Sequence, residues 1–249
     1  VHAVRGELEA DDLGLETDGL GLVDEGARVL AVQTHQQDVG LVGRDLGELN
    51  QIVLHLGNGC SASAVRGRVA VETSMGLTPL QGLVMGTRSG DVDPGLHTFL
   101  HNELGMSIGD IDALLNKQSG LKGMAGVNDF RELEERRAAG DEAAQLAFEV
   151  YVHRLKHYVG AYLVLLGRLD VLNFTAGVGE NNPALRAAVV DGLDGLGLQL
   201  DPELNNAPSK TARLISSESS PIKIAVVPTN EELEIARETA ELLESRSDS

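Results

Sequence analysis

Three short apolar runs in this chain each end at a turn of glycine or small polar residues, and this recurrence limits the fold more than any other feature. Each run has the length and composition of a buried strand. The runs are Asn50–Leu56, Asp170–Phe174 and Lys223–Val227, and the turns that follow them are Gly57–Gly59, Gly177–Asn181 and Pro228–Glu232. Strands, glycine turns and helical patterns in this order indicate an α/β domain.

Further elements are predicted around these strands. Ala62–Val65 and Val69–Thr73 flank a glycine turn, which favours a hairpin. Helices are predicted at His97–Leu104, from Asp110 onward, at Asp141–Leu166, after Asn182-Pro183, and from Glu231 onward, where Thr229 and Glu232 have capping-box spacing. Apolar residues of the long helix recur every three or four positions and predict core packing. They are Ala147, Tyr151, Leu155, Tyr158, Tyr162 and Leu166.

The first 43 residues differ from the rest of the chain. They contain no lysine, and residues 11–24 are acidic and interrupted by glycine, which disfavours a long helix there. The few apolar runs in this stretch, such as Ala27–Val32, could form a strand, but the capping signals are weak. We therefore divide the chain into an irregular segment, 1–43, and a folded domain, 44–249.

Composition excludes several classes of protein. A hydrophobic fraction of 42% indicates a globular chain, and a net charge of −18 argues against binding to a nucleic-acid backbone. Cys60 is the single cysteine, which excludes an intrachain disulfide and a cysteine-based metal cluster. No apolar run reaches the roughly 18 residues of a membrane span, and the first residues do not resemble a signal peptide. We expect a soluble, cytoplasmic protein that does not bind membranes.

The segment Met85–Pro94 carries the most specific chemistry. It places Arg88 among glycines, hydroxyls and carboxylates, with little bulk to bury. A guanidinium offers a planar set of donors suited to phosphate or carboxylate oxygens, and Gly86 and Gly90 allow close approach of a ligand. The simpler interpretation of such a segment is a surface loop with a solvated arginine.

The turns after the three strands suit the same chemistry. A glycine turn at the carboxyl end of a strand exposes backbone N–H groups, which bind phosphate oxygens. Each turn alone is weak evidence. Gly177-Val178-Gly179 also begins like a dinucleotide-binding fingerprint, but Asn182 stands where that motif needs its third glycine, so a nicotinamide-dependent oxidoreductase is a poor alternative.

Together these segments resemble the C-terminal domain of acetate kinases, of the acetate and sugar kinase/Hsp70/actin superfamily. The resemblance extends from about Leu46 to Leu243 and preserves the family's order of motifs. The segments that carry it are His55–Gly59, Thr73–Leu80 with Gly82–Asp91, Ser119–Leu121 with Asp129–Arg131, Phe174–Asn181 and Thr229–Leu233. It implies a ribonuclease H-like, actin-like ATPase fold, with a mixed sheet flanked by helices.

The resemblance also implies roles for individual residues. Arg88 would stabilise the transferring phosphoryl group, and Glu231 would take part in binding Mg²⁺. The implied nucleotide-binding residues are His55, Leu56, Gly57, Asn58, Gly59, Asp129, Phe130, Arg131, Gly177, Val178, Gly179, Glu180 and Asn181. Two simpler interpretations stay open: His55 as a core histidine at a strand end, and Glu231 as an acidic residue that stabilises a helix start.

The family's N-terminal motifs are absent. These motifs include a phosphate loop, an acetate-binding arginine, a catalytic aspartate and a His-Gly-Thr-Ser-His segment, and His35 does not stand in for the last of them. We therefore consider that residues 1–43 derive from a shifted reading frame or a misplaced start. Translation of the neighbouring frame should then recover the missing motifs.

Two functions follow from the resemblance. The first is an acetate kinase, which forms ADP and acetyl phosphate from ATP and acetate, or from a related acid such as propionate, with Mg²⁺ and as a homodimer. The alternative is a non-catalytic fragment that binds ATP but lacks the acetate site. On the chain as written, we expect activity to be lost or greatly reduced.

Overall fold

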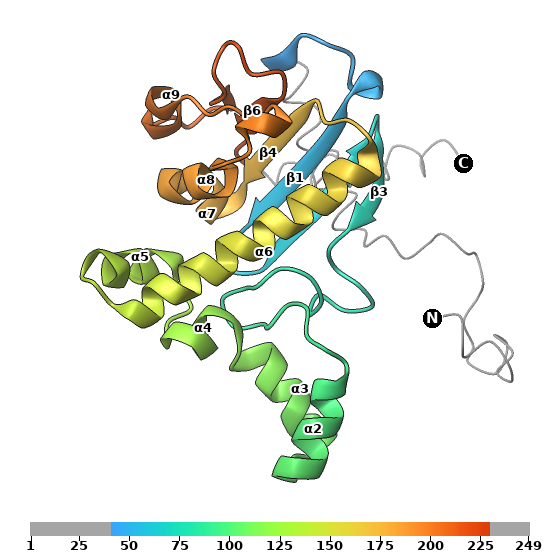
Figure 1. The fold of residues 1–249 in the computed structure, drawn as a ribbon, viewed down its shortest axis with the longest axis vertical. Helices are drawn as coiled ribbons and strands as arrows, with labels where there is room; N and C mark the ends of the chain where they lie inside the picture. The colour runs from blue at the N-terminus through green and yellow to red at the C-terminus, as the bar shows by residue number, and fades with distance from the viewer. Residues whose placement is uncertain (1–40, 230–249) are drawn as a thin grey trace, which may run out of the picture.

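The computed structural model describes residues 41–229, which are organised by one mixed sheet of six strands (Figure 1). The strands are β1 (Asn50–Leu56), β2 (Cys60–Arg66), β3 (Val69–Thr73), β4 (Val171–Thr175), β5 (Arg213–Leu214) and β6 (Lys223–Val226). Their order in the sheet is β3-β2-β1-β4-β6-β5. β4 pairs in parallel with β1 and β6, and the other neighbours pair antiparallel. The predicted α/β class and mixed sheet are confirmed.

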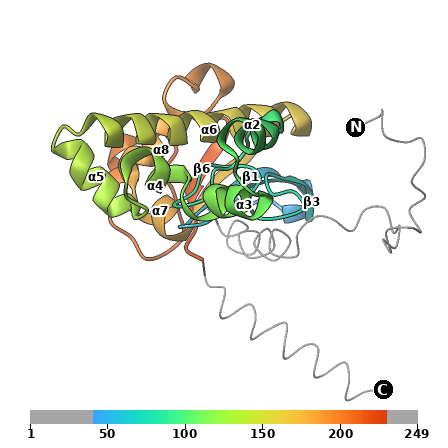
Figure 2. The same cartoon turned by 90° about the horizontal axis from the view of Figure 1, so that it is seen from below.

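Helices flank this sheet, and α6 lies across one of its faces (Figure 2). The helices are α2 (Gly95–Leu104), α3 (Ile108–Lys117), α4 (Gly120–Ala125), α5 (Phe130–Ala138), α6 (Glu142–Leu166), α7 (Ala176–Asn181), α8 (Pro183–Val190) and α9 (Pro202–Asn206). Short 3-10 turns occur at Leu46–Glu48 and Asp194–Leu196. Within residues 41–229, no helix is long and apolar enough to cross a bilayer.

The main core lies between the sheet and α6. Alternate residues of β1 (Ile52, Leu54 and Leu56) enter it, whereas Val53 packs with Val65 on the opposite face, as strand geometry requires. The predicted apolar stripe of α6 is confirmed: Ala147, Tyr151, Leu155, Tyr162 and Leu166 are buried, and Tyr158 is half-buried. Asp141 caps the helix by accepting the N–H groups of Ala143 and Ala144.

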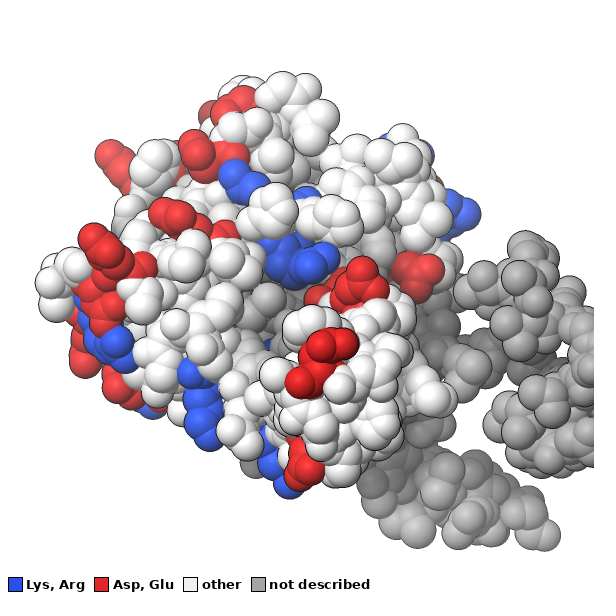
Figure 3. Space-filling view, turned by 60° about the horizontal axis from the view of Figure 1, so that its bottom comes forward, with Lys and Arg blue, Asp and Glu red and all other residues white. Residues whose placement is uncertain are grey.

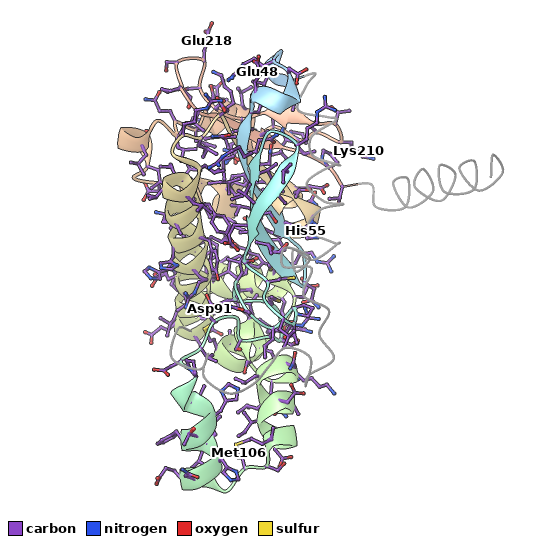
Figure 4. The ribbon with its side chains drawn as sticks, turned by 90° about the vertical axis from the view of Figure 1, so that its right-hand side faces the viewer. Glu48, His55, Asp91, Met106, Lys210 and Glu218 are labelled. Carbon is purple, nitrogen blue, oxygen red and sulfur yellow. The ribbon has the colours of Figure 1, made fainter. Side chains whose placement is uncertain are left out.

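The α2–α3 pair projects away from the sheet and has a small apolar cluster of its own. Leu100 of α2 is buried against Ile111 and Leu115 of α3, apart from the main core. Met106, between the two helices, marks the far end of this projection in Figure 4. The two helices are therefore connected to the rest of the chain by loops and do not pack on the sheet (Figure 1).

Parallel pairing brings the carboxyl ends of three strands to one edge of the sheet. His55 of β1 pairs in register with Thr175 of β4, and Phe174 pairs with Val226 of β6. The segments that leave these strands therefore begin side by side. This edge is where ligands bind in open α/β sheets.

One predicted element is wrong in kind, and another begins slightly earlier than predicted. The helix predicted from Asp110 is α3, which starts at Ile108, and Ser107 and Asp110 form a reciprocal capping box at its N-terminus. The predicted turn at 177–181 is instead the short helix α7. Ala176, at a φ of 62°, turns the chain sharply after β4, and side chains satisfy the carbonyl groups of the helix.

Other predicted elements are confirmed within one or two residues. The hairpin turns at Gly67, whose φ of 60° suits glycine, and Asn182 caps α8 with Pro183 at its first position. The predicted strand at 27–32 and the predicted helix from Glu231 lie outside the described residues.

Candidate functional site

A cleft of about 840 Å³ opens at the edge where the parallel strands end. This volume is within the range of roughly 300–1,000 Å³ that small-molecule sites occupy. The cleft brings together segments that are distant in sequence, from the turn after β1 to the start of α8. Eight residues predicted for the site line it: Gly57, Asn58, Asp129, Phe130, Arg131, Gly177, Val178 and Asn181.

The remaining predicted residues do not line this cleft. Leu56 and Gly179 are buried, and His55 is half-buried at the end of β1 (Figure 4). Gly59 and Arg88 lie just beyond the turn that forms one end of the cleft, and Glu180 faces the chain after β6. Glu231 lies outside the described residues.

The turn after β1 meets the loop that carries Arg88 (residues 82–91, called the arginine loop below) at one end of the cleft. The Gly57 N–H donates to the Gly59 carbonyl at 3.1 Å and closes the turn. The Gly86 N–H donates to the Asn58 carbonyl at 3.0 Å. A Cβ on residue 86 would collide with the Asn58 side chain and would stand 2.9 Å from the Asn128 carbonyl oxygen. Gly86 is therefore needed because three segments converge on it.

Arg88 lies next to this junction and is only partly exposed. Its Nη1 is 3.6 Å from the position that a Cβ on Gly59 would take, and it donates to the Pro79 carbonyl at 3.4 Å. Met85, Gly86 and Gly90 of the same loop are buried. Much of the loop is therefore buried, whereas Arg88 itself keeps contact with solvent.

Helices α3 and α4 fix the arginine loop from one side. Ser89 donates its N–H to Leu115, and Thr87 donates its hydroxyl to Asn116, both at 3.0 Å. The N–H groups of Leu121 and Lys122 donate to the carbonyls of Met85 and Gly86. The start of α4 thus holds the segment that carries Arg88.

Aromatic side chains form an apolar wall of the cleft. The Phe130 ring lies edge-on to Tyr151, with centroids 5.1 Å apart, and is tilted against Phe148 at 6.2 Å. The Tyr151 hydroxyl lies 3.0 Å from the Cys60 Sγ, beside the turn after β1. Burial raises the pKa of the Cys60 thiol to about 12, so it stays protonated at neutral pH.

Asp129 and Arg131 form a pair at the rim of the cleft. The Asp129 carboxylate caps α5 and accepts two hydrogen bonds from the Arg131 guanidinium, at 2.7 and 3.1 Å. These side-chain bonds, with the Arg131 backbone N–H, lower the pKa of Asp129 to about 2. The Arg131 side chain is 89% exposed, so this ion pair faces solvent at the cleft entrance.

Helix α7 forms the opposite wall, and its two glycines face different ways. A Cβ on Gly177 would meet nothing within 4 Å, whereas one on Gly179 would touch Phe174 and Leu56 of the core. Gly177 therefore leaves space in the cleft, and Gly179 allows the helix to pack closely on the sheet.

A buried arginine holds the end of α7 in place. Arg186 of α8 is 1% exposed and donates to the carbonyls of Gly179 and Glu180, and to the side chain and carbonyl of Asn205, all at 2.8 Å. Burial lowers the pKa of Arg186 to about 10. Its hydrogen bonds satisfy the buried guanidinium and tie α7 to α9.

Six further residues line the cleft that the sequence interpretation did not assign to it: Gly86, Leu121, Asn128, Glu134, Tyr151 and Asn182. Gly86 adjoins Arg88, and Asn128 precedes Asp129, so each had a local signal. Glu134 had no local sequence signal, because only the tertiary structure brings it to the cleft. Its carboxylate accepts from Arg137 at 2.7 Å and from the Asn182 side chain at 3.1 Å, and so joins α5 to α8.

Acidic and basic side chains are interspersed on the face of the molecule that Figure 3 presents. No cluster of three or more His, Cys, Asp or Glu side chains suited to a metal ion occurs within residues 41–229.

Thr229, the last described residue, donates its N–H at 3.1 Å and its hydroxyl at 3.3 Å to the Glu180 carboxylate of α7.

Comparison with known proteins gives a consistent result. The family model described as the acetokinase family matches residues 32–237. An acetate kinase of Leifsonia xyli subsp. xyli is 59% identical over 198 residues, which are 80% of this chain and 50% of that protein.

Two solved structures are similar to this chain. The acetate kinase of Porphyromonas gingivalis has a TM-score of 0.83 and 39% identity, covering 87% of this chain and 54% of that one. A propionate kinase of Francisella tularensis subsp. tularensis has a TM-score of 0.78 and 42% identity, covering 85% and 53%. The chain spans about half the length of the relatives it matches.

Proposed function

The chain belongs to the acetokinase family, and from this membership we propose that residues 44–249 are the nucleotide-binding domain of an acetate kinase. The fold is the actin-like ATPase fold of the acetate kinases to which it is similar. The reaction would convert ATP and acetate to ADP and acetyl phosphate. The observation that carries this proposal is the convergence of Gly57–Asn58, Gly86, Asp129–Arg131 and α7 on one cleft beside Arg88.

The two ends of the cleft suit the two ends of ATP. At one end, the turn after β1 and the nearby guanidinium of Arg88 offer donors for phosphate oxygens. Along the cleft, Phe130, Tyr151 and Val178 supply an apolar surface for the nucleoside, and Gly177 leaves room for it. We assign the phosphates to the first end and the adenosine to the second.

The reaction needs positioning and charge neutralisation more than covalent chemistry by the protein. A carboxylate oxygen of acetate forms a bond to the γ-phosphorus as the bond from that phosphorus to the β,γ-bridging oxygen breaks. ADP leaves with that electron pair. Arg88 would stabilise the negative charge spread over the transferring phosphoryl group.

We propose Mg²⁺ as the metal, on the basis of family membership. Mg²⁺ binds nucleotide phosphates together with one or two carboxylates, so a cluster of protein ligands is not required. Thr229 is tied to α7 at the wall of the cleft, and Glu231 follows it by two residues in sequence. Glu231 would supply the carboxylate, and bound Mg²⁺ would neutralise phosphate charge.

The identity of the acid substrate and the oligomeric state are properties of the whole protein. Acetate is the acid we propose, and the Francisella relative is named a propionate kinase. We also propose a cytoplasmic homodimer, on the basis of family membership.

The alternative is a non-catalytic fragment that binds ATP. The chain spans about half the length of its relatives, and the acetate-site motifs of the family are absent from its sequence.

One experiment separates the two functions. The purified 249-residue chain is assayed for acetyl phosphate formation and, in parallel, titrated with ATP and Mg²⁺ by calorimetry. Turnover at rates like those of complete acetate kinases would refute the fragment alternative. ATP binding without turnover would support it, and the absence of both would contradict the nucleotide site itself.

A further inference from the structure

Hydrogen bonds between Gly82 and Asp91, the two end residues of the arginine loop, close the loop. We call this pair of residues the neck of the loop. The Asp91 N–H donates to the Gly82 carbonyl, and the Gly82 N–H donates to the Asp91 Oδ1, both at 3.0 Å. Within the loop, the Met85 N–H donates to the Arg88 carbonyl at 3.2 Å. Gly90, at a φ of 71°, lies so close to Gly82 and Leu83 that a Cβ on it would stand 2.5 to 2.6 Å from their carbonyl oxygens. The geometry at Arg88 thus depends on this neck.

The second carboxylate oxygen of Asp91 reaches a different part of the molecule. It accepts a hydrogen bond from the Tyr158 hydroxyl at 2.7 Å, and Arg154 lies 3.5 Å from the same oxygen. Both side chains belong to α6, and Figure 4 shows Asp91 beside that helix. Two turns earlier, α6 carries Tyr151 into the wall of the cleft. One carboxylate therefore joins the neck of the loop to the helix that forms the cleft.

We propose that Asp91 and Tyr158 are positioning residues for Arg88. Their hydrogen bond holds the neck of the loop 82–91 against α6, while α3 and α4 hold its other side. This two-sided attachment fixes where the guanidinium stands relative to the turn at Gly57–Gly59. The proposal rests on the phosphoryl-stabilising role of Arg88 proposed above, but its structural part can be tested without nucleotide.

The chain provides a matched pair of substitutions. Tyr158→Phe removes the hydroxyl that donates to Asp91 and leaves the ring. Tyr162→Phe, one turn later on α6, removes a buried hydroxyl that has no hydrogen-bond partner within the described residues. Both changes delete a single oxygen from an aromatic side chain of the same helix.

Amide hydrogen exchange tests the attachment directly. In Tyr158→Phe, the amides of Gly82 and Asp91 should exchange roughly 5- to 10-fold faster, whereas amides of β1 and β4 should be unchanged. Tyr162→Phe should match the unmodified chain. Equal protection of the neck amides in all variants would overturn the proposal.

Ligand binding tests the consequence for Arg88. The probes are Mg²⁺–ADP and Mg²⁺–ADP with aluminium fluoride, which imitates the transferring phosphoryl group. The unmodified chain should bind the aluminium fluoride complex more tightly than Mg²⁺–ADP alone, and this difference is the extra affinity. Arg88→Ala should abolish the extra affinity, and Tyr158→Phe should reduce it about 3- to 10-fold while the affinity for ADP is unchanged.

Two results would separate failure of this inference from failure of the proposed function. Equal weakening of both probes by Tyr158→Phe would indicate general damage to the cleft and would overturn the positioning role. Absence of any extra affinity in the unmodified chain would contradict the proposed function of Arg88, while the exchange measurement would still decide the attachment.

Discussion

Asn58 occupies the space that a side chain on residue 86 would need, and its carbonyl accepts the Gly86 N–H at 3.0 Å. The turn after the first strand and the loop that carries Arg88 are therefore in direct contact, although they are far apart in the sequence. Any change in this contact alters both the phosphate end of the cleft and the position of the arginine.

Gly86→Ala should disturb this junction. The added methyl group would collide with the Asn58 side chain and crowd the Asn128 carbonyl, so we expect a loss of about 1–3 kcal/mol in the free energy of unfolding. ATP affinity should fall at least about tenfold, because the turn and the loop move apart. Urea denaturation and ATP titration measure the two effects.

Gly177→Ala is the matched control for this substitution. It also adds a methyl group to the cleft, but no protein atom lies within 4 Å of the new carbon. Stability should be unchanged or slightly higher, since alanine favours a helix, and ATP affinity should fall because the methyl group occupies ligand space. Similar stability losses in both variants would contradict the close packing assigned to Gly86.

Arg88→Ala should affect transfer more than binding. If the guanidinium stabilises charge that develops during transfer, any acetyl phosphate formation measured for the unmodified chain should fall about 10²- to 10³-fold, while ATP affinity changes less than about threefold. Arg68→Ala, at an exposed arginine of the hairpin turn, serves as the charge control. An equal loss of binding and transfer would argue against the catalytic assignment.

Arg186→Met should destabilise the domain. The substitution leaves buried carbonyl groups of Gly179, Glu180 and Asn205 without their donor, and we expect a loss of about 2–4 kcal/mol in the free energy of unfolding. The chemical-denaturation midpoint should fall accordingly. A midpoint equal to that of the unmodified chain would show that the hydrogen bonds of Arg186 are not needed to hold α7.

The Asp129–Arg131 pair predicts a specific pH dependence. The pKa of Asp129 is lowered from its ordinary 3.8 to about 2, so its contribution to stability is present above pH 3.8 and disappears as the pH falls toward 2. A carboxyl-carbon NMR titration should place the midpoint near 2. In Arg131→Ala the midpoint should rise toward 3.8, and an unchanged midpoint would exclude the guanidinium as the cause.

Local sequence signals predicted most of the fold. The strands at 50–56 and 171–175 and the hairpin between them followed from apolar runs with glycine at their ends, and such signals depend on neighbours in sequence. Helix α7 was predicted as a turn because its two glycines disfavour a helix. Its stability depends on Arg186 and Asn205, which no pattern within 177–181 reveals.

The site was predicted less completely than the fold. Family motifs identified Gly57, Asn58 and Asp129, because these residues lie in short contiguous segments. Glu134 and Tyr151 line the same cleft but resemble ordinary helix residues in sequence. The bond between Asp91 and Tyr158 joins positions 67 residues apart, and only the packing of the loop on α6 brings them together.

The separate apolar cluster of α2 and α3 has a consequence for motion. Because Leu100, Ile111 and Leu115 pack among themselves and not in the main core, we expect this pair to open as a unit without unfolding the sheet. The same unit supplies the carbonyl of Leu115, which accepts from Ser89 beside the arginine. We therefore expect α2, α3 and the arginine loop to open and close together. A partner that binds these two helices would then also reduce the motion of the loop.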